Sequence, residues 1–353
     1  MEKFDFNKHK LKAIEAYQKE QPKYEILANS IRKILAPALS LKNINIHKLE
    51  SRSKEIESFA KKAAKPSEDN PEAPKYPDPL NEITDLAGVR IITFLPKDLT
   101  TIDTCIQEEF DVKEKTDKSE QLEEQGKFGY KSIHYLIQLK QDRTKLTEYR
   151  ELQGLTAEIQ ARTILQHAWA EMEHDIQYKS STTIPSSIKR RFIALAGMLE
   201  IADREFQAIQ DEDLETRKIA DKNIQTGNFS DVEITPKALK SYLDKKFSPD
   251  QRMTEFSYEF LAKQLRKIGF ENFKQIDDCI TGYDSTQISR ILWGSKQGQI
   301  LRFEDTLLAS MGENFQLLHP WGEQDWFRDR VSRCLKDLKK NRILPKNYSP
   351  LAE

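Results

Sequence analysis

The sequence predicts an α/β (α+β) fold, in which a mixed sheet of about five strands is surrounded by helices and a small α+β domain follows. Residues 86–95, LAGVRIITFL, form a nearly continuous apolar run, typical of a central strand that is buried on both faces. Residues 157–162 alternate between apolar and polar, which is typical of a strand, and helical spacing begins at Ile164. Residues 8–40 are also expected to be helical, so helices should surround the sheet.

The other elements follow from the same periodicities and from the turn residues between them. Five prolines between residues 65 and 79 predict a loop. In chain order, the remaining expectations are a helix break at Pro37, a strand near 44–49, a basic helix over 52–65, a turn or short helix over 80–85, a helix over 98–110, a strand from 112, a strand over 132–139, and a helix over 184–213 whose apolar face includes Phe192, Leu195, Met198 and Ile201.

The chain of 353 residues is expected to contain two domains. A first domain over 1–213 should hold the sheet, 214–230 is charged and poor in core residues and should be a linker, and 231–353 should form the C-terminal domain. Thr235-Pro236 is a typical helix entry in that second domain.

Composition excludes several classes of protein. The net charge of −1 gives no global attraction to nucleic acid or to a membrane surface, so phosphate chemistry must come from local clusters. Three scattered cysteines without a CxxC argue against a disulfide framework and a thiolate zinc site. With no apolar run long enough for a membrane span, a cytoplasmic location is expected.

Familiar motifs are absent, and one histidine-rich helix is ambiguous. The sequence contains no GxxxxGK[ST], GxGxxG or GxSxG, so P-loop, dinucleotide-binding and hydrolase-elbow sites lose support. His167, Glu171 and His174 share one helix face, but they do not form HExxH. They are either metal ligands or, as we expect, hydrogen-bonded residues that pack the helix.

Two clusters precede and open the buried strand. Arg52, Lys54, Lys61 and Lys62 gather where a strand meets a helix, which suits a polyphosphate but is also typical of a solvated basic face. Asp85 stands three residues before Gly88 and five before Arg90. It could hold Mg²⁺ beside a phosphate ligand, or it could cap a helix.

Two further clusters lie on later strands. In Gly126–His134, two glycines free the backbone and Tyr130 could stack on a nucleobase, with His134 following on the strand; the alternative is a hairpin turn whose tyrosine closes the core edge. Glu158, Gln160 and Arg162 share one strand face, which either builds a site or is the solvated face of an edge strand.

Together these clusters read R-x-K-(x)6-K, D-x-x-G-x-R, G-Y-x-S-x-H and E-x-Q-x-R-T, in that order. This series resembles the synthetase domain of the RelA/SpoT family, pyrophosphokinases that make (p)ppGpp, over about residues 10–210. The whole layout is similar to CapRel-type toxic small alarmone synthetases. Those fuse the synthetase to a neutralising domain related to a zinc finger, and phage proteins release their activity.

The resemblance implies transfer of the β,γ-pyrophosphate of ATP to a ribose 3′-hydroxyl, with Mg²⁺ as cofactor. It implies that Arg52 and Arg90 sandwich the adenine, and that Lys54 with Lys61 or Lys62 holds the ATP phosphates. Asp85 and Glu158 would bind Mg²⁺ and form the catalytic pair, with Glu158 also accepting the 3′-hydroxyl proton. Tyr130, His134 and Gln160 would bind the acceptor.

The acceptor stays open between GTP or GDP and the 3′-CCA end of tRNA. Phe128 replaces the asparagine common before the Gly-Tyr pair, and Gly126 replaces a frequent lysine. Cys279, His319 and Cys334 are too few for a standard zinc finger, so any such resemblance is to a metal-free version. A catalytically inactive nucleotide- or RNA-binding module is the alternative from another class, and a phage protein is a further expected partner of the C-terminal domain.

Overall fold

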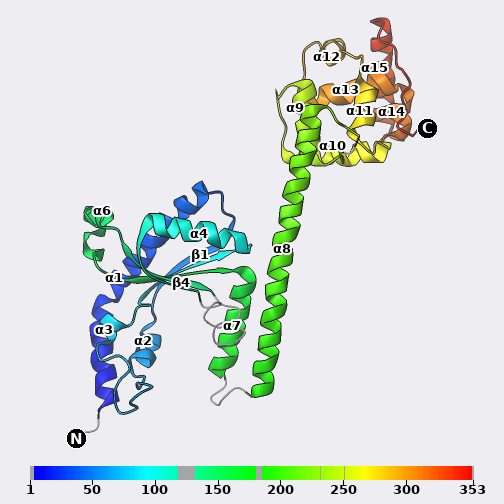
Figure 1. Ribbon diagram of the computed structural model, residues 1–353. Coiled ribbons are helices and arrows are strands. Elements are labelled where there is room, and N and C mark those ends of the chain that lie inside the picture. The colour runs from blue at the N-terminus through cyan, green and yellow to red at the C-terminus, as the bar shows by residue number, and fades with distance from the viewer. Residues whose placement is uncertain (1–3, 118–131, 180–184, 231, 250, 352–353) are drawn as a thin grey trace. The chain divides into compact units, whose positions relative to one another are not determined.

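The computed structural model describes residues 4–117, 132–179, 185–230, 232–249 and 251–351. It divides into two compact units, residues 1–209 and 210–353, and each is described by itself (Figure 1). Among the described residues, no helix is both long and apolar enough to cross a membrane.

The first unit is built on a mixed five-stranded sheet of order β1-β2-β5-β4-β3, which confirms the predicted architecture. Only β2 and β5 are parallel, and the other neighbours pair antiparallel. Its elements are α1 Phe6–Leu41, β1 Ile46–Ser53, α2 Ile56–Ala63, α3 Pro79–Glu82, β2 Ala87–Thr93, α4 Pro96–Glu109, β3 Phe110–Asp117, β4 Ile133–Leu139, α6 Gln141–Thr144, η1 Thr147–Leu152, β5 Ala157–Thr163, α7 Ile164–Lys179 and α8 Ser186–Thr226, which extends into the second unit.

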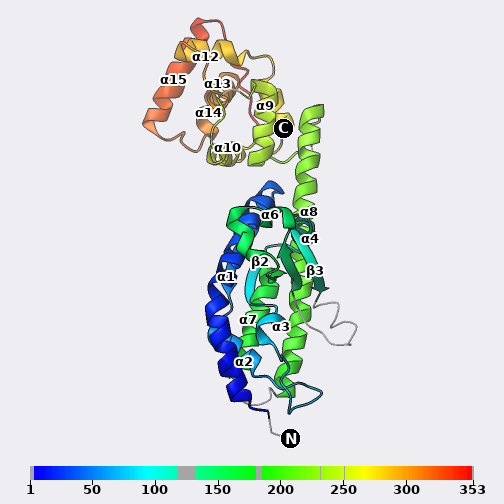
Figure 2. The same cartoon turned by 90° about the vertical axis from the view of Figure 1, so that its left-hand side faces the viewer.

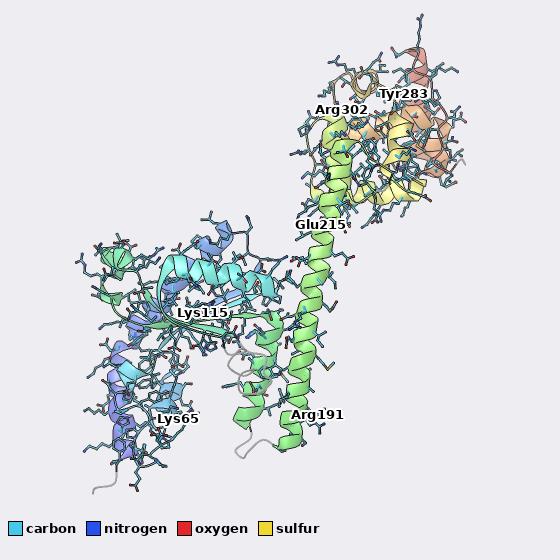
Figure 3. All side chains as sticks on the ribbon, viewed as in Figure 1. Lys65, Lys115, Arg191, Glu215, Tyr283 and Arg302 are labelled. Carbon is cyan, nitrogen blue, oxygen red and sulfur yellow. The ribbon has the colours of Figure 1, made fainter. Side chains whose placement is uncertain are left out.

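One face of the sheet forms the core, because the strands alternate. Val89 and Ile91 of β2 and Ile159 of β5 are buried under α1 and α4, whereas Arg90 and Gln160 point to the opposite face. Figure 1 shows α4 above the strands and α7 below them. On α4, Asp103 pairs with Lys115 of β3 (2.8 Å), and Figure 3 labels that lysine.

The helix α1 continues through Pro37, so the predicted break is wrong. Leu35 and Leu39, on either side of the proline, are both buried in the core, and this packing outweighs the backbone hydrogen bond that proline removes near the helix end. Figure 2 shows α1 lengthwise with α2 beside it. Tyr17 of α1 stacks on Phe59 of α2, with 4.3 Å between ring centroids.

The packing of α8 also differs from the prediction. Leu195, Met198 and Ile201 are 44%, 67% and 62% exposed, whereas Ala196 is buried and packs with Trp169 of α7. Phe192, the fourth residue of the predicted face, is partly buried and packs against the same cluster. The spacing therefore predicted the helix and the packing of Phe192 correctly, but the other three side chains of the predicted face are exposed.

A carboxyl group lies in the contact between α8 and the sheet. Asp203 is 3% exposed, and its Oδ2 accepts a hydrogen bond from Thr163 Oγ1 (2.7 Å). Its other oxygen has no hydrogen-bond partner among the described residues. Burial raises the pKa of Asp203 to about 7.

We expect Asp203 to make the first unit less stable as the pH rises. Because the pKa in the folded state lies above the ordinary value near 4, the folded state prefers the protonated form, and stability is lost as pH rises through about 7. Asp203→Asn should remove this dependence. In urea unfolding, the variant should gain about 1–2 kcal/mol relative to the native chain between about pH 5.5 and about pH 8. Parallel stability curves would contradict this assignment.

The second unit is helical in the part of the chain that the structure describes, so the predicted α+β domain is wrong there. Its only strand-like pairing among those residues is an isolated bridge between Glu233 and Asn272. After the end of α8, its helices are α9 Pro236–Phe247, α10 Glu255–Ile268, α11 Phe273–Ile280, α12 Ser285–Trp293, α13 Gln299–Met311, α14 Glu313–Leu318 and α15 Asp325–Lys340. The stretch 214–230, expected to be a linker, is helical as far as Thr226.

Caps and apolar spacing explain the helices of this unit. Thr235 accepts a hydrogen bond from the Ala238 amide at the start of α9, and Asp284 caps α12 in the same way. The helix α13 is buried on nearly every side, and Arg302, labelled in Figure 3, donates to the Phe247 carbonyl (2.5 Å). The core of the unit therefore forms around α13.

Candidate functional site

The register of the sheet brings the predicted polar residues into two adjacent rows on the face opposite the core. Each strand contributes every second side chain to this face, so rows form only where the strands are in register. The paired residues are Arg52, Gly88 and Glu158 in one row and Glu50, Arg90, Gln160 and His134 in the next.

A cavity of about 260 Å³ opens over these rows. Its lining contains five of the predicted site residues together with four neighbours from β1 and β2. The lining residues are Glu50, Ser51, Arg52, Asp85, Gly88, Val89, Arg90, Glu158 and Gln160. Three carboxylates and two guanidinium groups, drawn from separate parts of the sequence, therefore share one space.

Asp85 is held by two lysines. It stands just before β2, and its two oxygens accept hydrogen bonds from Lys54 Nζ (2.5 Å) and Lys62 Nζ (3.1 Å). Burial alone would raise the pKa of Asp85, but the hydrogen bond and charge of Lys54, with those of Lys62, hold it below its ordinary value. Asp85 is thus ionised at neutral pH.

The backbone of Lys54 is fixed from the core side. Its amide donates to the Leu86 carbonyl (2.9 Å), and its own carbonyl accepts hydrogen bonds from the Tyr17 hydroxyl (2.7 Å) and from Gln21 Nε2 (3.1 Å). The helix α1 thereby fixes the position of the Lys54 backbone, from which the side chain reaches Asp85.

The two adjacent lysines of α2 point in different directions. Lys62 is partly buried and reaches Asp85, whereas Lys61 is exposed and pairs with Glu57 one turn earlier (2.7 Å). The sequence left these two lysines as alternatives, and the structure brings only Lys62 to Asp85.

Glu158 is held by a second set of partners. His134 Nδ1 donates to Glu158 Oε1 (2.6 Å), since an ionised carboxylate only accepts, and Gln160 Nε2 donates to Oε2 (3.2 Å). The other ring nitrogen of His134 lies 2.8 Å from Ser132 Oγ. Burial alone would raise the pKa of Glu158, but the hydrogen bond and charge of His134 hold it below its ordinary value.

The two carboxylates repel each other across the cavity. The charge of Asp85 raises the pKa of Glu158, which partly offsets the effect of His134. Two ionised carboxylates facing one space are a suitable donor set for Mg²⁺, which takes one or two protein carboxylates and completes its shell with phosphates and water. In the described ranges, no three His, Cys, Asp or Glu side chains gather as metal ligands, so the protein alone would not enclose the ion.

Arg90 is tied to a residue that the sequence did not connect with it. Its Nη1 lies 3.2 Å from Glu171 of α7 and 3.8 Å from Glu50 of β1. Glu171 is also 3.7 Å from Arg162 and 3.6 Å from His167. On the histidine-rich face of α7, Glu171 is therefore the centre of an ion-pair cluster with the two arginines. Through Arg90, the strands β1 and β2 are linked to α7. The alternation of residues along the strands does not predict how α7 is oriented.

Arg162 lies on the same face as Glu158 and Gln160, as the alternation predicted, although the resemblance assigned it no role. It is 5% exposed, and burial together with the charge of Arg90 lowers its pKa to about 10. This leaves Arg162 charged at neutral pH.

One predicted acceptor residue cannot be placed. Tyr130 lies outside the described residues, as do Gly126 and Phe128. In the second unit, Cys279 and Cys334 are buried free thiols, and His319 stacks on Phe327 with 4.3 Å between ring centroids.

Comparison with known proteins places a family region over this site. Residues 51–183 match the family described as the region found in RelA / SpoT proteins. Two curated relatives from Bacillus subtilis (strain 168) are each 29% identical: the GTP pyrophosphokinase YwaC over 130 residues, and the GTP pyrophosphokinase YjbM over 142 residues. The matches cover 37% and 38% of this chain and 59% and 62% of those relatives, so the chain spans about 60% of their length.

Solved structures from the same organism show a partial likeness. The small alarmone synthetase 1 bound to its product pppGpp is 23% identical with a TM-score of 0.45, covering 56% of this chain and 97% of that one. The small alarmone synthetase 2 is 24% identical with a TM-score of 0.46, covering 56% and 99%. From the family match and the curated relatives, the chain carries a RelA/SpoT region and is related to the GTP pyrophosphokinases.

Proposed function

We propose that the chain is a Mg²⁺-dependent pyrophosphokinase that transfers the β,γ-pyrophosphate of ATP to a ribose 3′-hydroxyl. The observation that carries this proposal is the single cavity in which Asp85 and Glu158 face Arg52 and Arg90. Pyrophosphate transfer needs positioning and neutralisation of charge more than covalent chemistry, and this cavity supplies both.

In the proposed reaction, the 3′-oxygen forms a bond to the β-phosphorus of ATP. The bond from that phosphorus to the α,β-bridging oxygen breaks, and AMP leaves with the electron pair. Glu158, kept ionised by His134, accepts the proton of the hydroxyl. Because its pKa is lowered, Glu158 is a weak base. It is suited to accept the proton late in the reaction, after bond formation to phosphorus has made the hydroxyl strongly acidic.

The lysines have a second task in this proposal. Mg²⁺, when bound, would neutralise phosphate charge between Asp85 and Glu158. Lys54 and Lys62 now occupy both oxygens of Asp85, and on ATP binding they would turn to the phosphates, which are the stronger anions. Arg52 and Arg90 would hold the adenine between them, with Glu171 setting the position of Arg90.

The two lysines of α2 provide a matched test of this arrangement. We expect Lys62→Met to raise KM for ATP about tenfold, because one charged hydrogen bond to phosphate is worth roughly 1.4 kcal/mol or more. Lys61→Met should leave KM within about twofold, since Lys61 pairs with the exposed Glu57. Steady-state kinetics with varied ATP measures both variants, and equal effects would contradict the assignment of Lys62.

A guanine nucleotide is the acceptor that we propose first, since both curated relatives are named GTP pyrophosphokinases. The 3′ end of tRNA is the second acceptor, supported by Phe128 before the Gly-Tyr pair. Tyr130 would stack on the acceptor base, while His134 and Gln160 would reach the acceptor through Glu158. Control of the reaction by the second unit, with a phage protein as trigger, rests on the sequence resemblance alone.

One labelling experiment distinguishes these possibilities. The full chain is incubated with ATP labelled at the γ-phosphate and either GDP or deacylated tRNA, with Mg²⁺ or with EDTA. We expect Mg²⁺-dependent label on GDP, and label on tRNA instead would assign the toxin-type acceptor. ATP binding without Mg²⁺ dependence and without labelled product would identify an inactive binding module and overturn the proposed reaction.

A further inference from the structure

A groove on the second unit is lined mainly by apolar side chains. It lies between α10 and α13 and encloses about 410 Å³. Its lining residues are Gln251, Met253, Phe256, Ser257, Phe260, Leu261, Gln297, Gly298, Ile300, Leu301 and Glu304. All of its lining residues lie within residues 210–353.

The rim of the groove exposes large apolar side chains to solvent. Met253 is 58% exposed, Phe256 is 73% exposed and Phe260 is 42% exposed. Phe256 stacks on Phe260 with 6.4 Å between ring centroids, and Phe260 lies 5.8 Å from Trp321. Single exposed apolar residues are ordinary, but a contiguous group of this kind marks an interaction site.

The aromatic strip continues beyond the groove. Trp321 is 37% exposed, and its ring lies 5.5 Å from that of Trp326, which is 53% exposed. Tryptophan and phenylalanine supply much of the binding energy in protein interfaces. Neither Trp321 nor Trp326 lines the groove, so the exposed aromatic surface continues beyond it, which suits a polypeptide better than a small molecule.

One carboxyl group in the groove lining makes no ion pair, and it is the only charged residue that lines the groove among the described residues. Glu304 is partly buried, and among the described residues no hydrogen bond or ion pair reaches it. Its neighbour Asp305 is fully buried and is satisfied by Trp293 Nε1 (2.7 Å) and by Arg330 (3.5 Å). Burial raises the pKa of Glu304 to about 7. The charge of Arg330 lowers this pKa but does not outweigh burial, so the cost of desolvating the carboxylate is only partly offset within the unit.

We propose that this groove binds a segment of a partner protein that places one Lys or Arg against Glu304 and apolar side chains over Phe256, Phe260 and Trp321. A cation of the partner would make the direct ion pair that Glu304 lacks, and apolar side chains would cover the exposed rings. This site is separate from the proposed pyrophosphokinase reaction and does not depend on it.

The test uses three labelled amphipathic peptides that differ at one position. Each carries Leu and Phe at helical spacing, with Arg, citrulline or Glu in the middle. Fluorescence anisotropy with the full chain should show micromolar binding of the Arg peptide and about tenfold weaker binding of the citrulline peptide. The Glu peptide should bind more weakly still. No binding, or equal binding of the Arg and citrulline peptides, would overturn the proposal.

Two variants and one control locate the binding to the groove. Glu304→Gln keeps the shape of the side chain and should weaken the Arg peptide about tenfold while leaving the citrulline peptide unchanged. Phe260→Ala should weaken the binding of both peptides. Glu313→Gln, the control, replaces an exposed glutamate at the start of α14 and should leave the affinity of both peptides unchanged. If the chain instead self-associates in sedimentation and Phe260→Ala abolishes this, the occupant is a second copy and the proposed partner is wrong.

Discussion

Glu158→Gln is expected to lower turnover by about a thousandfold or more, because one residue would serve both as a metal ligand and as the proton acceptor. The substituted amide keeps an oxygen that can accept the hydrogen bond from His134 Nδ1, so the local structure should persist. Steady-state kinetics with saturating ATP and GDP measures the loss, and circular dichroism shows that the fold is retained.

The control for this variant is an acid of the same type outside the cavity. Glu148 is exposed at the start of η1, and Glu148→Gln should retain native turnover. If Glu158→Gln kept more than about a tenth of native turnover, Glu158 would be neither ligand nor base, since those roles are worth hundredfold effects or more.

Asp85→Asn is expected to lower kcat/KM by about a hundredfold to a thousandfold and to raise the Mg²⁺ concentration needed for half-maximal rate. It should also destabilise the first unit by about 1–3 kcal/mol, since the Lys54 side chain is only 14% exposed and loses its counter-charge. Kinetics at varied Mg²⁺ and urea unfolding near neutral pH measure the two effects separately.

The pH dependence of this destabilisation provides an internal check. The pKa of Asp85 lies below its ordinary value in the folded state, so its stabilising contribution is present above about pH 4 and is lost as the pH falls through the folded pKa. The variant and the native chain should therefore approach equal stability in acid. Asp69→Asn, on an exposed loop, should change neither stability nor Mg²⁺ dependence. An unaltered Mg²⁺ requirement in Asp85→Asn would remove Asp85 from the metal site.

The sheet and most of its polar face could be predicted because alternation is a local property. The apolar run of residues 86–95 identified an interior strand, although Gly88 and Arg90 of this strand line the cavity instead of being buried on both faces as predicted. The period of two after Ala157 put Glu158 and Gln160 on one face. What alternation cannot give is the order of strands and the partner of each side chain. The contact between Arg90 and Glu171 depends on how α7 packs, and no sequence spacing determines it.

The second unit shows where local patterns were insufficient. Its helices have typical caps, such as Asn272 and Asp284, but they are short and separated by turns, which also suits a mixed fold. The buried helix α13 is apolar at Phe303 and Leu307 yet also contains Arg302 and Asp305, whose partners lie far away in sequence. Long-range pairing of this kind decides the packing and is not visible in a single sequence.

Because β2 lies inside the sheet, between β1 and β5, the spacing of its residues positions both the site and the core. The same seven-residue strand sends Val89 and Ile91 into the hydrophobic interior and Arg90 into the cavity, and its pairing with β5 does the same for Ile159 and Glu158. Adding or deleting one residue in either strand would exchange the two faces, so apolar groups would line the cavity while charges entered the interior. The chemistry here can therefore be altered by exchanging side chains, but the spacing of these strands cannot change without loss of the fold.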